Sequence, residues 1–512
     1  MSTQTIAIIG AGPSGLVTAK EAKSCGLSPT VFESSGQIGG IWQSGNGKVW
    51  DDMKINNSRH AASFSDFEWE PGAEDFPNQK AVFQYLCRYA EAFHLGSAIK
   101  FHSKIIRVQE VEGNQADKKR WQVIWENAHG QHEQRSFDFL AVCSGFLSRP
   151  FRPQIDGMET FTGTVLDAQD YKSPVSFANR RIAVIGNAYS GCEIAAEVAQ
   201  TAAQVVHIFR NPRWIMTRYL KDKESGDTLP CNLQFYRRAR FLASGSMEPS
   251  SVLFEQKHAA MRAFCQKQEE VPSIKVPPPY TVPPLSTISD TYLDKVKKGD
   301  VNPRHVHIER IAANRLQLSD KNEVEVDDII FCTGYRTELA FLSDEMKKSM
   351  AFDQDDSLLP LPLYKAVFPA NYANIAFIGM VRFGIYFGPV EMQARFATMT
   401  FSGKLPTPSA EELQDGVEEE LAIRHAQPRI QLGNRDHNRY QEDLGRLIGV
   451  LPDFSALKQD NQSLHTKLIQ GPFTSASFRL SGFASNPDVA LRMIDDINKK
   501  AEKPLSQPEC EN

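Results

Sequence analysis

The 512-residue sequence lacks the features that mark several large protein classes. None of its eight cysteines forms a Cys-x-x-Cys pair, which argues against a disulfide framework, a zinc site or a thiol redox centre. The twelve histidines show no ligand spacing, so we predict no metal site. Acidic residues outnumber basic ones by 62 to 57, and the net charge of −5 provides no basic surface for nucleic acid.

Long apolar runs and an N-terminal targeting pattern are also missing. No segment approaches the roughly 20 apolar residues that span a bilayer, and an apolar strand pattern begins at Thr5, without room for a signal peptide before it. We therefore expect a cytoplasmic protein with no membrane anchor. The length suits two or three domains with substantial cores, and a homodimer is the expected assembly because two-fold dimers are the commonest oligomers.

Two glycine-rich fingerprints are the most informative feature that the sequence does contain. The first runs Gly10-Ala-Gly12-Pro13-Ser14-Gly15 after the apolar segment 6–9, and the second runs Gly186-Asn-Ala188-Tyr-Ser190-Gly191 after the segment 182–185. Each combination predicts a strand, a tight turn and a helix whose first N–H groups meet a pyrophosphate. Two such sites imply two dinucleotides bound together, an arrangement that favours hydride transfer between them.

The residues that end the next predicted strand distinguish the two nucleotides. Glu33 follows the first fingerprint, and its carboxylate suits ribose hydroxyls of a nucleotide without a 2′-phosphate. Arg210 and Arg213 occupy the matching place after the second fingerprint, where guanidinium groups attract a 2′-phosphate. The second site is therefore predicted to bind NADPH.

The order of segments predicts an α/β fold with two Rossmann-like dinucleotide-binding domains, the second nested within the first. A strand followed by Cys-Ser/Thr-Gly occurs after each fingerprint, at Cys143-Ser-Gly145 and at Cys332-Thr333-Gly334, which indicates internal duplication. The expected boundaries are 1–160 and 330–500 for the first domain with its C-terminal helices, 161–329 for the second with an insertion around 222–284, and 501–512 for a polar, disordered tail.

Further segments extend the pattern beyond the fingerprints. They are Gly39-Gly40-Ile41-Trp42, Asn56-Asn57-Ser58-Arg59, Phe64-Ser65-Asp66-Phe67, Phe331-Cys332-Thr333-Gly334-Tyr335, Ala376-Phe377-Ile378-Gly379 and Val390-Glu391-Met392-Gln393-Ala394-Arg395. Together with the fingerprints, they resemble the flavin-containing monooxygenases, class B flavoprotein monooxygenases that use FAD and NADPH. The resemblance runs from about Thr5 to Lys404 in the family's order.

The resemblance implies an enzyme in which NADPH reduces FAD, and reduced flavin and O2 form a C4a-hydroperoxide that oxygenates a soft nucleophile, by N- or S-oxygenation of a small molecule. Asn56 takes the place of the family's catalytic asparagine, whose uncharged amide donates a hydrogen bond beside the flavin. The implied FAD contacts are Gly10, Gly12, Pro13, Ser14, Gly15, Glu33, Gly40, Ile41, Trp42, Ile105 and Gln393, and those on the NADPH side are Gly186, Ser190, Gly191, Arg210, Arg213, Thr333 and Gly334.

Two positions depart from the family's pattern, both on the nicotinamide side. Its identifying sequence, Phe-x-Gly-x-x-x-His-x-x-x-Tyr or Phe, has Asp167 here in place of the histidine. That carboxylate would weaken the retention of NADP⁺ or pair with a nearby cation such as an arginine. Ala188 replaces the second glycine of the NADPH fingerprint and adds a methyl group where backbone meets pyrophosphate.

Three other functions compete with N- or S-oxygenation. A Baeyer–Villiger monooxygenase acting on a ketone shares both Rossmann units, but its identifying sequence ends in tryptophan where Tyr171 stands. A disulfide reductase is excluded because no redox cysteine pair follows the first fingerprint. An uncoupled NADPH oxidase or nucleotide sensor stays open, and only the departures at Asp167 and Ala188 favour it.

Overall fold

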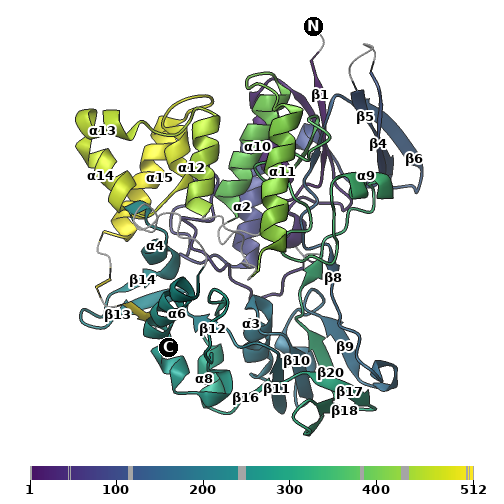
Figure 1. Cartoon of the computed structure of the whole chain (residues 1–512), viewed down its shortest axis with the longest axis vertical. Coiled ribbons are helices and arrows are strands. Elements are labelled where there is room, and N and C mark those ends of the chain that lie inside the picture. The colour runs from purple at the N-terminus through teal and green to yellow at the C-terminus, as the bar shows by residue number, and fades with distance from the viewer. Residues whose placement is uncertain are drawn as a thin grey trace.

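Two five-stranded parallel sheets form the framework of the molecule, one in the upper part of Figure 1 near the N-terminus and one in the lower part. The structure, a computed structural model, describes residues 3–43, 45, 48–113, 119–239, 250–380, 386–427, 437–502, 505–506 and 508–510. Helices at the left of the view belong to the insertion and to the C-terminal part of the chain.

The first sheet has the strand order β22-β7-β1-β2-β3, and each neighbouring pair is parallel. Its strands are β1 (Thr5–Ile9), β2 (Ser28–Phe32), β3 (Ile99–Lys100), β7 (Phe139–Val142) and β22 (Ile375–Phe377). Such short, nearly continuous apolar strands suit a parallel sheet that is covered on both faces. Helix α1 (Pro13–Ser24) packs against α10 (Phe387–Phe401), and α2 (Gln79–Ala92) contributes to the same core.

The second sheet repeats this plan with the order β9-β20-β10-β11-β16, again parallel throughout. Its strands are β9 (Thr164–Asp167), β10 (Arg181–Ile185), β11 (Gln204–Phe209), β16 (Val301–His305) and β20 (Asp328–Phe331), with helices α3 (Tyr189–Val198) and α8 (Tyr292–Lys297). In each sheet the strand before the fingerprint is central, and the strand before the Cys-Ser/Thr-Gly turn lies beside it. The predicted duplication is confirmed at the level of topology.

The chain order shows that the second domain is nested within the first. Strand β22, which closes the first sheet beside β7, follows all five strands of the second sheet in the sequence. The outgoing connection β8 (Arg149–Pro150) pairs with the returning connection β21 (Tyr335–Arg336). The predicted boundary at 329 falls inside β20, so the second domain ends a few residues later than expected.

Smaller elements complete the two domains. An antiparallel meander of β4 (Lys104–Glu112), β5 (Lys119–Glu126) and β6 (His132–Phe137) packs on the first domain, and β17 (Ile308–Ala312), β18 (Arg315–Leu318) and β19 (Glu323–Glu325) form another on the second. The described helices that follow the second sheet in the chain, besides α10, are α9 (Asp344–Ser349), α11 (Ala410–His425), α12 (His437–Leu447), α13 (Phe454–Asp460), α14 (Gln462–Gln470) and α15 (Pro487–Lys500). No helix in the described part of the chain is long and apolar enough to cross a membrane.

The insertion is bracketed by β12 (Trp214–Met216) and β15 (Ser286–Ile288), which pair in parallel. Between them lie β13 (Tyr219–Asp222), β14 (Thr228–Pro230), α4 (Cys231–Phe235), α6 (Ser251–Phe264) and α7 (Gln266–Glu269). These elements have an apolar core of their own, and that core includes residues from α15 and from the C-terminal tail.

The prediction of a disordered tail is wrong for the described residues. Strand β23 (Pro508–Cys510) pairs antiparallel with β13, and α6 packs against it. The backbone N–H of Ser506 donates to Asp222 at 2.6 Å, while the side chains of Leu505 and Cys510 are buried in the insertion's core. A polar sequence therefore becomes ordered because two apolar side chains and one sheet edge hold it in place.

Candidate dinucleotide sites and active-site stretch

The first and third glycines of the first fingerprint are required by the turn geometry. Gly10 has φ +100°, and a Cβ there would lie 2.9 Å from the carbonyl oxygen of Cys143. A Cβ at Gly15 would lie 1.8 Å from the carbonyl oxygen of Gly10, which no larger residue can accommodate. The turn at Cys143 is thus in direct contact with the first fingerprint.

The second fingerprint has the same geometry. Gly186 has φ +102°, and a Cβ there would lie 2.5 Å from the carbonyl oxygen of Cys332. A Cβ at Gly191 would lie 1.7 Å from the carbonyl oxygen of Gly186. Two turns that agree so closely give helices α1 and α3 equivalent positions relative to their sheets.

The middle position of the fingerprint is less restricted, which explains the alanine. Gly12 has φ −73° and ψ −175°, and Ala188 has φ −77° and ψ −169°, a conformation open to any residue. A Cβ at Gly12 would make an ordinary 3.5 Å contact with Gly40. Within the described residues no side chain caps α1 or α3, so their first-turn N–H groups can receive the pyrophosphates of two dinucleotides. The residues therefore fit FAD and NADPH.

Glu33 is buried beneath the first fingerprint rather than extended into solvent. One carboxylate oxygen accepts from the backbone N–H of Ala11 at 2.8 Å, and the other accepts from the N–H of Ser35 at 2.9 Å. The turn Gly39-Gly40 packs on the same loop, since the N–H of Gly39 donates to Ala11 at 2.9 Å. Ile41 and Trp42 follow in a short 3-10 helix, and Trp42 is half-buried against the first core.

Ser14 and Gln393 have partners within the protein. The hydroxyl groups of Ser14 and Tyr386 are 2.7 Å apart, close to the turn at Gly379. The fully buried Gln393 accepts from the N–H of Gly379 at 2.9 Å and donates to the carbonyl of Ala366 at 2.8 Å. Gln393 therefore supports the Gly379 turn, and its contact with flavin stays a prediction.

Ile105 and Pro13 are placed by regular structure. Ile105 lies in β4 opposite Trp125 and packs on the core beneath the first sheet. Pro13 occupies the first turn of α1, where its missing N–H leaves nothing unpaired. Their contacts with FAD also stay predictions.

Cationic residues lie at the end of β11, near the start of α3. Arg210 follows β11 directly and is exposed, and its carbonyl accepts from the His305 ring at 2.6 Å. Asn187 in the fingerprint donates to the carbonyl of Asn211 at 2.7 Å, which joins the two loops. Arg213 is half-buried, and burial lowers its pKa. This arrangement suits a phosphate monoester beside the second fingerprint.

The turn Thr333-Gly334 joins the connection between domains. Gly334 has φ +91°, and its carbonyl accepts from the N–H of Phe151 at 2.9 Å. The Thr333 hydroxyl donates to the carbonyl of Phe151. Ser190, predicted to bind phosphate, is the half-buried second residue of α3.

Asp167 pairs with an arginine, one of the two outcomes expected for it. Arg152 donates to both carboxylate oxygens, at 2.7 and 3.0 Å. The same guanidinium lies 5.8 Å from the centre of the Phe331 ring. The aspartate in place of the family's histidine thus fixes the connection 149–152 to the end of β9.

Asn56 is connected to the second domain by a buried arginine that the sequence analysis missed. Arg218 donates to Asn56 Oδ1 at 3.4 Å and to the carbonyl of Ile55 at 3.0 Å. It also donates to the carbonyl of Lys54 at 3.2 Å, and to Glu193 on α3 and Asp290, both at 2.8 Å. A lone cation within the apolar segment 214–220 was the available signal, because a charge buried there must be paired.

The same stretch is tied to the insertion. The N–H of Ser58 donates to Asn232 Oδ1 at 2.9 Å, and Asn232 Nδ2 donates back to the Ser58 hydroxyl at 3.1 Å. Asn232 lies in α4. Asn56 is therefore held in a segment that contacts the insertion through Asn232 and is linked to the helix of the second fingerprint through Arg218.

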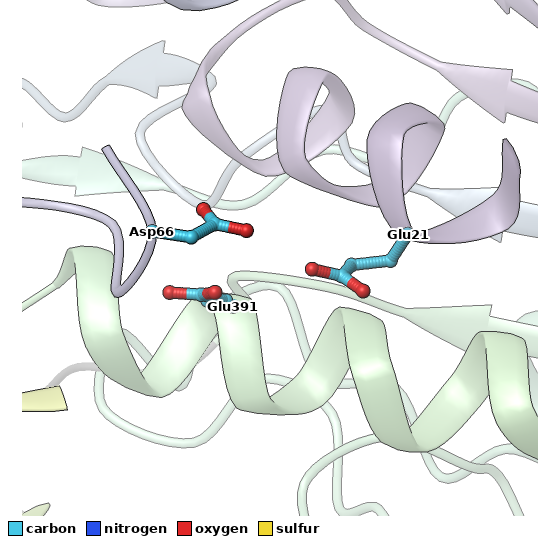
Figure 2. A group of neighbouring side chains, drawn as sticks. All are labelled: Glu21, Asp66 and Glu391. Carbon is cyan, nitrogen blue, oxygen red and sulfur yellow. The ribbon is translucent and has the colours of Figure 1, made fainter. Parts of the chain in front are cut away.

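Three buried carboxylates, Glu21, Asp66 and Glu391, approach one another behind the first fingerprint (Figure 2), within 4.8 Å. Their partners are cations rather than one another. Arg479 lies 2.5 Å from Glu391 and 3.1 Å from Asp66 and also contacts Glu21, while Lys20 pairs with Glu21 at 2.8 Å. The cluster is therefore an ion-pair network that joins α1, α10 and the C-terminal region.

Two fingerprint sites on nested parallel sheets, one with an acidic and one with a basic strand end, define a two-dinucleotide oxidoreductase. A family model described as flavin-binding monooxygenase-like matches residues 3–509, and the chain belongs to this family. It is an FAD-dependent monooxygenase that uses NADPH, and the predicted fold, enzyme class and cofactors are confirmed.

Similar proteins span nearly the whole chain. Dimethylaniline monooxygenase [N-oxide-forming] 2 of Mus musculus is 29% identical over 93% of this chain and 88% of its own length. Flavin-containing monooxygenase 5 of Oryctolagus cuniculus is 28% identical over 99% and 94%. Among solved structures, S-allyl-L-cysteine S-oxygenase from Allium sativum has a TM-score of 0.63 at 20% identity, covering 97% of this chain and 99% of that one. Cyclohexanone monooxygenase from Rhodococcus sp. Phi1 has a TM-score of 0.66 at 15% identity, covering 88% and 98%.

Proposed function

We propose that this monooxygenase oxygenates a soft nitrogen or sulfur nucleophile of a small molecule. The observation that carries the proposal is the contact from Arg218 to Asn56, which fixes the asparagine beside the helix of the second fingerprint. The names of two similar proteins, an N-oxide-forming monooxygenase and an S-oxygenase, support the substrate class.

The chemistry assigned to Asn56 follows from how its amide is held. When bound, FAD and NADPH supply hydride transfer and the activation of O2. Arg218 donates to the amide oxygen of Asn56, so the amide nitrogen is left to donate towards a ligand. Because the amide is uncharged, it orients a neighbouring polar group without adding charge to the site.

The fixed geometry of this segment also bears on water exclusion. Ser58 is fully buried and makes two hydrogen bonds with Asn232, and the following residues up to Ser65 are mostly buried. This buried segment next to Asn56 limits the access of water, which would otherwise cause the activated oxygen to be released as hydrogen peroxide.

Asn56→Asp tests the assignment. We expect product formation to fall at least 100-fold while NADPH still reduces the flavin, because the carboxylate loses the amide's donors and binds Arg218 more strongly. Stopped-flow reduction and product analysis separate the two effects. Asn371→Asp, at an exposed asparagine that donates to Ser349 at 3.1 Å, is the matched control. Product formation at the wild-type rate in the Asn56 variant would rule out the role.

The substrate class is tested by following NADPH loss against peroxide release over amines, thioethers and ketones. N- or S-oxygenation predicts that amines or thioethers give oxygenated product with little peroxide. Conversion of a ketone to an ester or lactone as the main activity would favour Baeyer–Villiger oxygenation. One peroxide per NADPH with every substrate class would favour an uncoupled oxidase.

We also propose a cytoplasmic homodimer. All eight cysteines are free, which fits a reducing compartment. Size-exclusion chromatography with light scattering tests the assembly, and a monomer at micromolar concentration contradicts it.

A further inference from the structure

Two cysteines that are distant in the sequence meet where the tail joins the insertion. Cys265, between α6 and α7, and Cys510, in β23, have their sulfur atoms 3.8 Å apart and are separated by 245 positions. Their exposed fractions are 2% and 6%. The contact depends on the tail being ordered, so the sequence alone gave no reason to pair them.

The elements around the two cysteines hold their sulfur atoms next to each other. Cys510 lies opposite Leu220 in the β13–β23 pairing, and α6 packs against the same strand. Its sulfur is 3.9 Å from the carbonyl oxygen of Ile215. Cys231 belongs to the same apolar core and provides an internal comparison.

We propose that Cys265 and Cys510 form an oxidation site, at which hydrogen peroxide produces an intramolecular disulfide that fastens the tail strand to the insertion. The Cys510 thiolate attacks one oxygen of peroxide, the O–O bond breaks, and a sulfenic acid and hydroxide result. Hydroxide takes the proton of Cys265, whose sulfur attacks the sulfenic sulfur and releases the second oxygen as hydroxide, which takes the proton lost by Cys510. Two thiols and one peroxide become one disulfide and two waters.

The order of the two steps follows from the contact between the thiols. The two sulfur atoms are within hydrogen-bonding distance, and either thiol can be the donor. The contact with Cys265 lowers the pKa of Cys510, although burial opposes it. Cys143 provides a contrast, because burial raises the pKa of its thiol to about 12. Cys510 also lies in the three-residue edge strand β23, whose release exposes it to peroxide. We therefore assign Cys510 as the attacking thiol and Cys265 as the resolving one.

Peroxide reaches the pair by local release of β23. This strand has three residues and lies at the edge of its sheet, paired only through β13 within the described residues. Short edge strands belong to the part of a fold that opens at the lowest free-energy cost. Oxidation then ties the strand down and raises the midpoint of thermal unfolding by several degrees, an effect that dithiothreitol reverses.

The test treats the cofactor-loaded protein with hydrogen peroxide, blocks free thiols with iodoacetamide and maps tryptic peptides without reduction. We expect Ala263–Lys267 joined to 501–512. Cys510→Ser and Cys265→Ser should abolish this product, whereas Cys87→Ser, at a half-buried cysteine elsewhere, should retain it. Because wild-type peptides identify the linkage, the result does not depend on whether a variant folds.

Three outcomes would overturn the proposal. In the first, both cysteines are still free thiols after peroxide treatment and are therefore alkylated by iodoacetamide. In the second, they are oxidised to sulfinic acid without forming a cross-link. In the third, Cys510 forms a disulfide with Cys231 instead of Cys265. The test is independent of the proposed function, since peroxide is added and no substrate is turned over.

Discussion

Arg479→Met tests the buried ion-pair network most directly. Arg479 is fully buried and contacts three carboxylates, of which Glu21 and Glu391 are each 1% exposed. Methionine keeps a comparable volume but leaves the carboxylates with Lys20 and Arg395 as the remaining cations of the cluster. Removing one partner from a buried ion pair costs about 3–5 kcal/mol, because the charge left behind has lost its solvation without compensation.

The pKa of Glu21 gives a second route to this magnitude. Burial raises the pKa, but Arg479 and Lys20 outweigh burial and lower it from 4.5 to about 2. That difference corresponds to about 3 kcal/mol of stability, present above pH 4.5 and lost as the pH falls towards 2. Without Arg479, the largest of the attractive charges is gone, so the pKa of Glu21 rises from its lowered value and Glu21 stabilises the fold less.

Urea unfolding followed by tryptophan fluorescence measures both effects. At pH 7 we expect the free energy of unfolding of Arg479→Met to be about 3–5 kcal/mol lower than that of the wild type. Between pH 5 and pH 3 it should decline less steeply than that of the wild type. FAD retention should fall as well, because Glu21 lies on α1, the helix of the first fingerprint. The control is Arg492→Met, whose partner Glu68 is 39% exposed and whose loss costs at most about 1 kcal/mol. A loss below about 1 kcal/mol for Arg479→Met would refute the reasoning.

Three further predictions concern the NADPH side. Arg210→Ala should raise the KM for NADPH roughly 10-fold or more and the KM for NADH less than about twofold, since only NADPH has a 2′-phosphate; equal effects would contradict the assignment. Gly191→Ala should abolish NADPH binding, measured by flavin reduction, whereas Ala188→Gly should leave NADPH binding nearly unchanged. Similar effects of the two substitutions would show that the geometry of the turn does not determine NADPH binding. Asp167→Asn should change the affinity for NADP⁺ less than Arg152→Ala, because the latter leaves the carboxylate of Asp167 unpaired. Titration calorimetry measures both affinities, and a larger change in Asp167→Asn than in Arg152→Ala would contradict the pairing.

Local patterns explain why the fold could be predicted from the sequence. A strand, a glycine turn and a helix occupy about 20 consecutive residues, so the fingerprints at Gly10 and Gly186 identified both sheets. The first and third glycines carry this signal because only glycine fits them. The order of segments along the chain predicted the nesting, and the pairing of β22 with β7 shows it in the structure.

Contacts between distant segments explain what the sequence did not reveal. Arg218 meets Asn56, and Arg479 meets Glu21, across 162 and 458 positions. A single sequence gives the charge of such residues but not their partners. The tail was misjudged for the same reason, because its polar composition predicted disorder while the strand β13 that pairs with it lies far earlier in the chain.

The two departures from the family's pattern do not by themselves favour an uncoupled oxidase. Ala188 has nearly the same backbone conformation as Gly12, so the methyl group leaves the path of the fingerprint unchanged. The carboxylate of Asp167 is paired with the guanidinium of Arg152, so the two side chains together add little net charge at the end of β9. If Asn56 lies beside the flavin as proposed, coupling depends on whether this residue and the buried segment that follows it keep water from the flavin. The ratio of peroxide to product in Asn56 variants is therefore more informative about coupling than changes at either departing position.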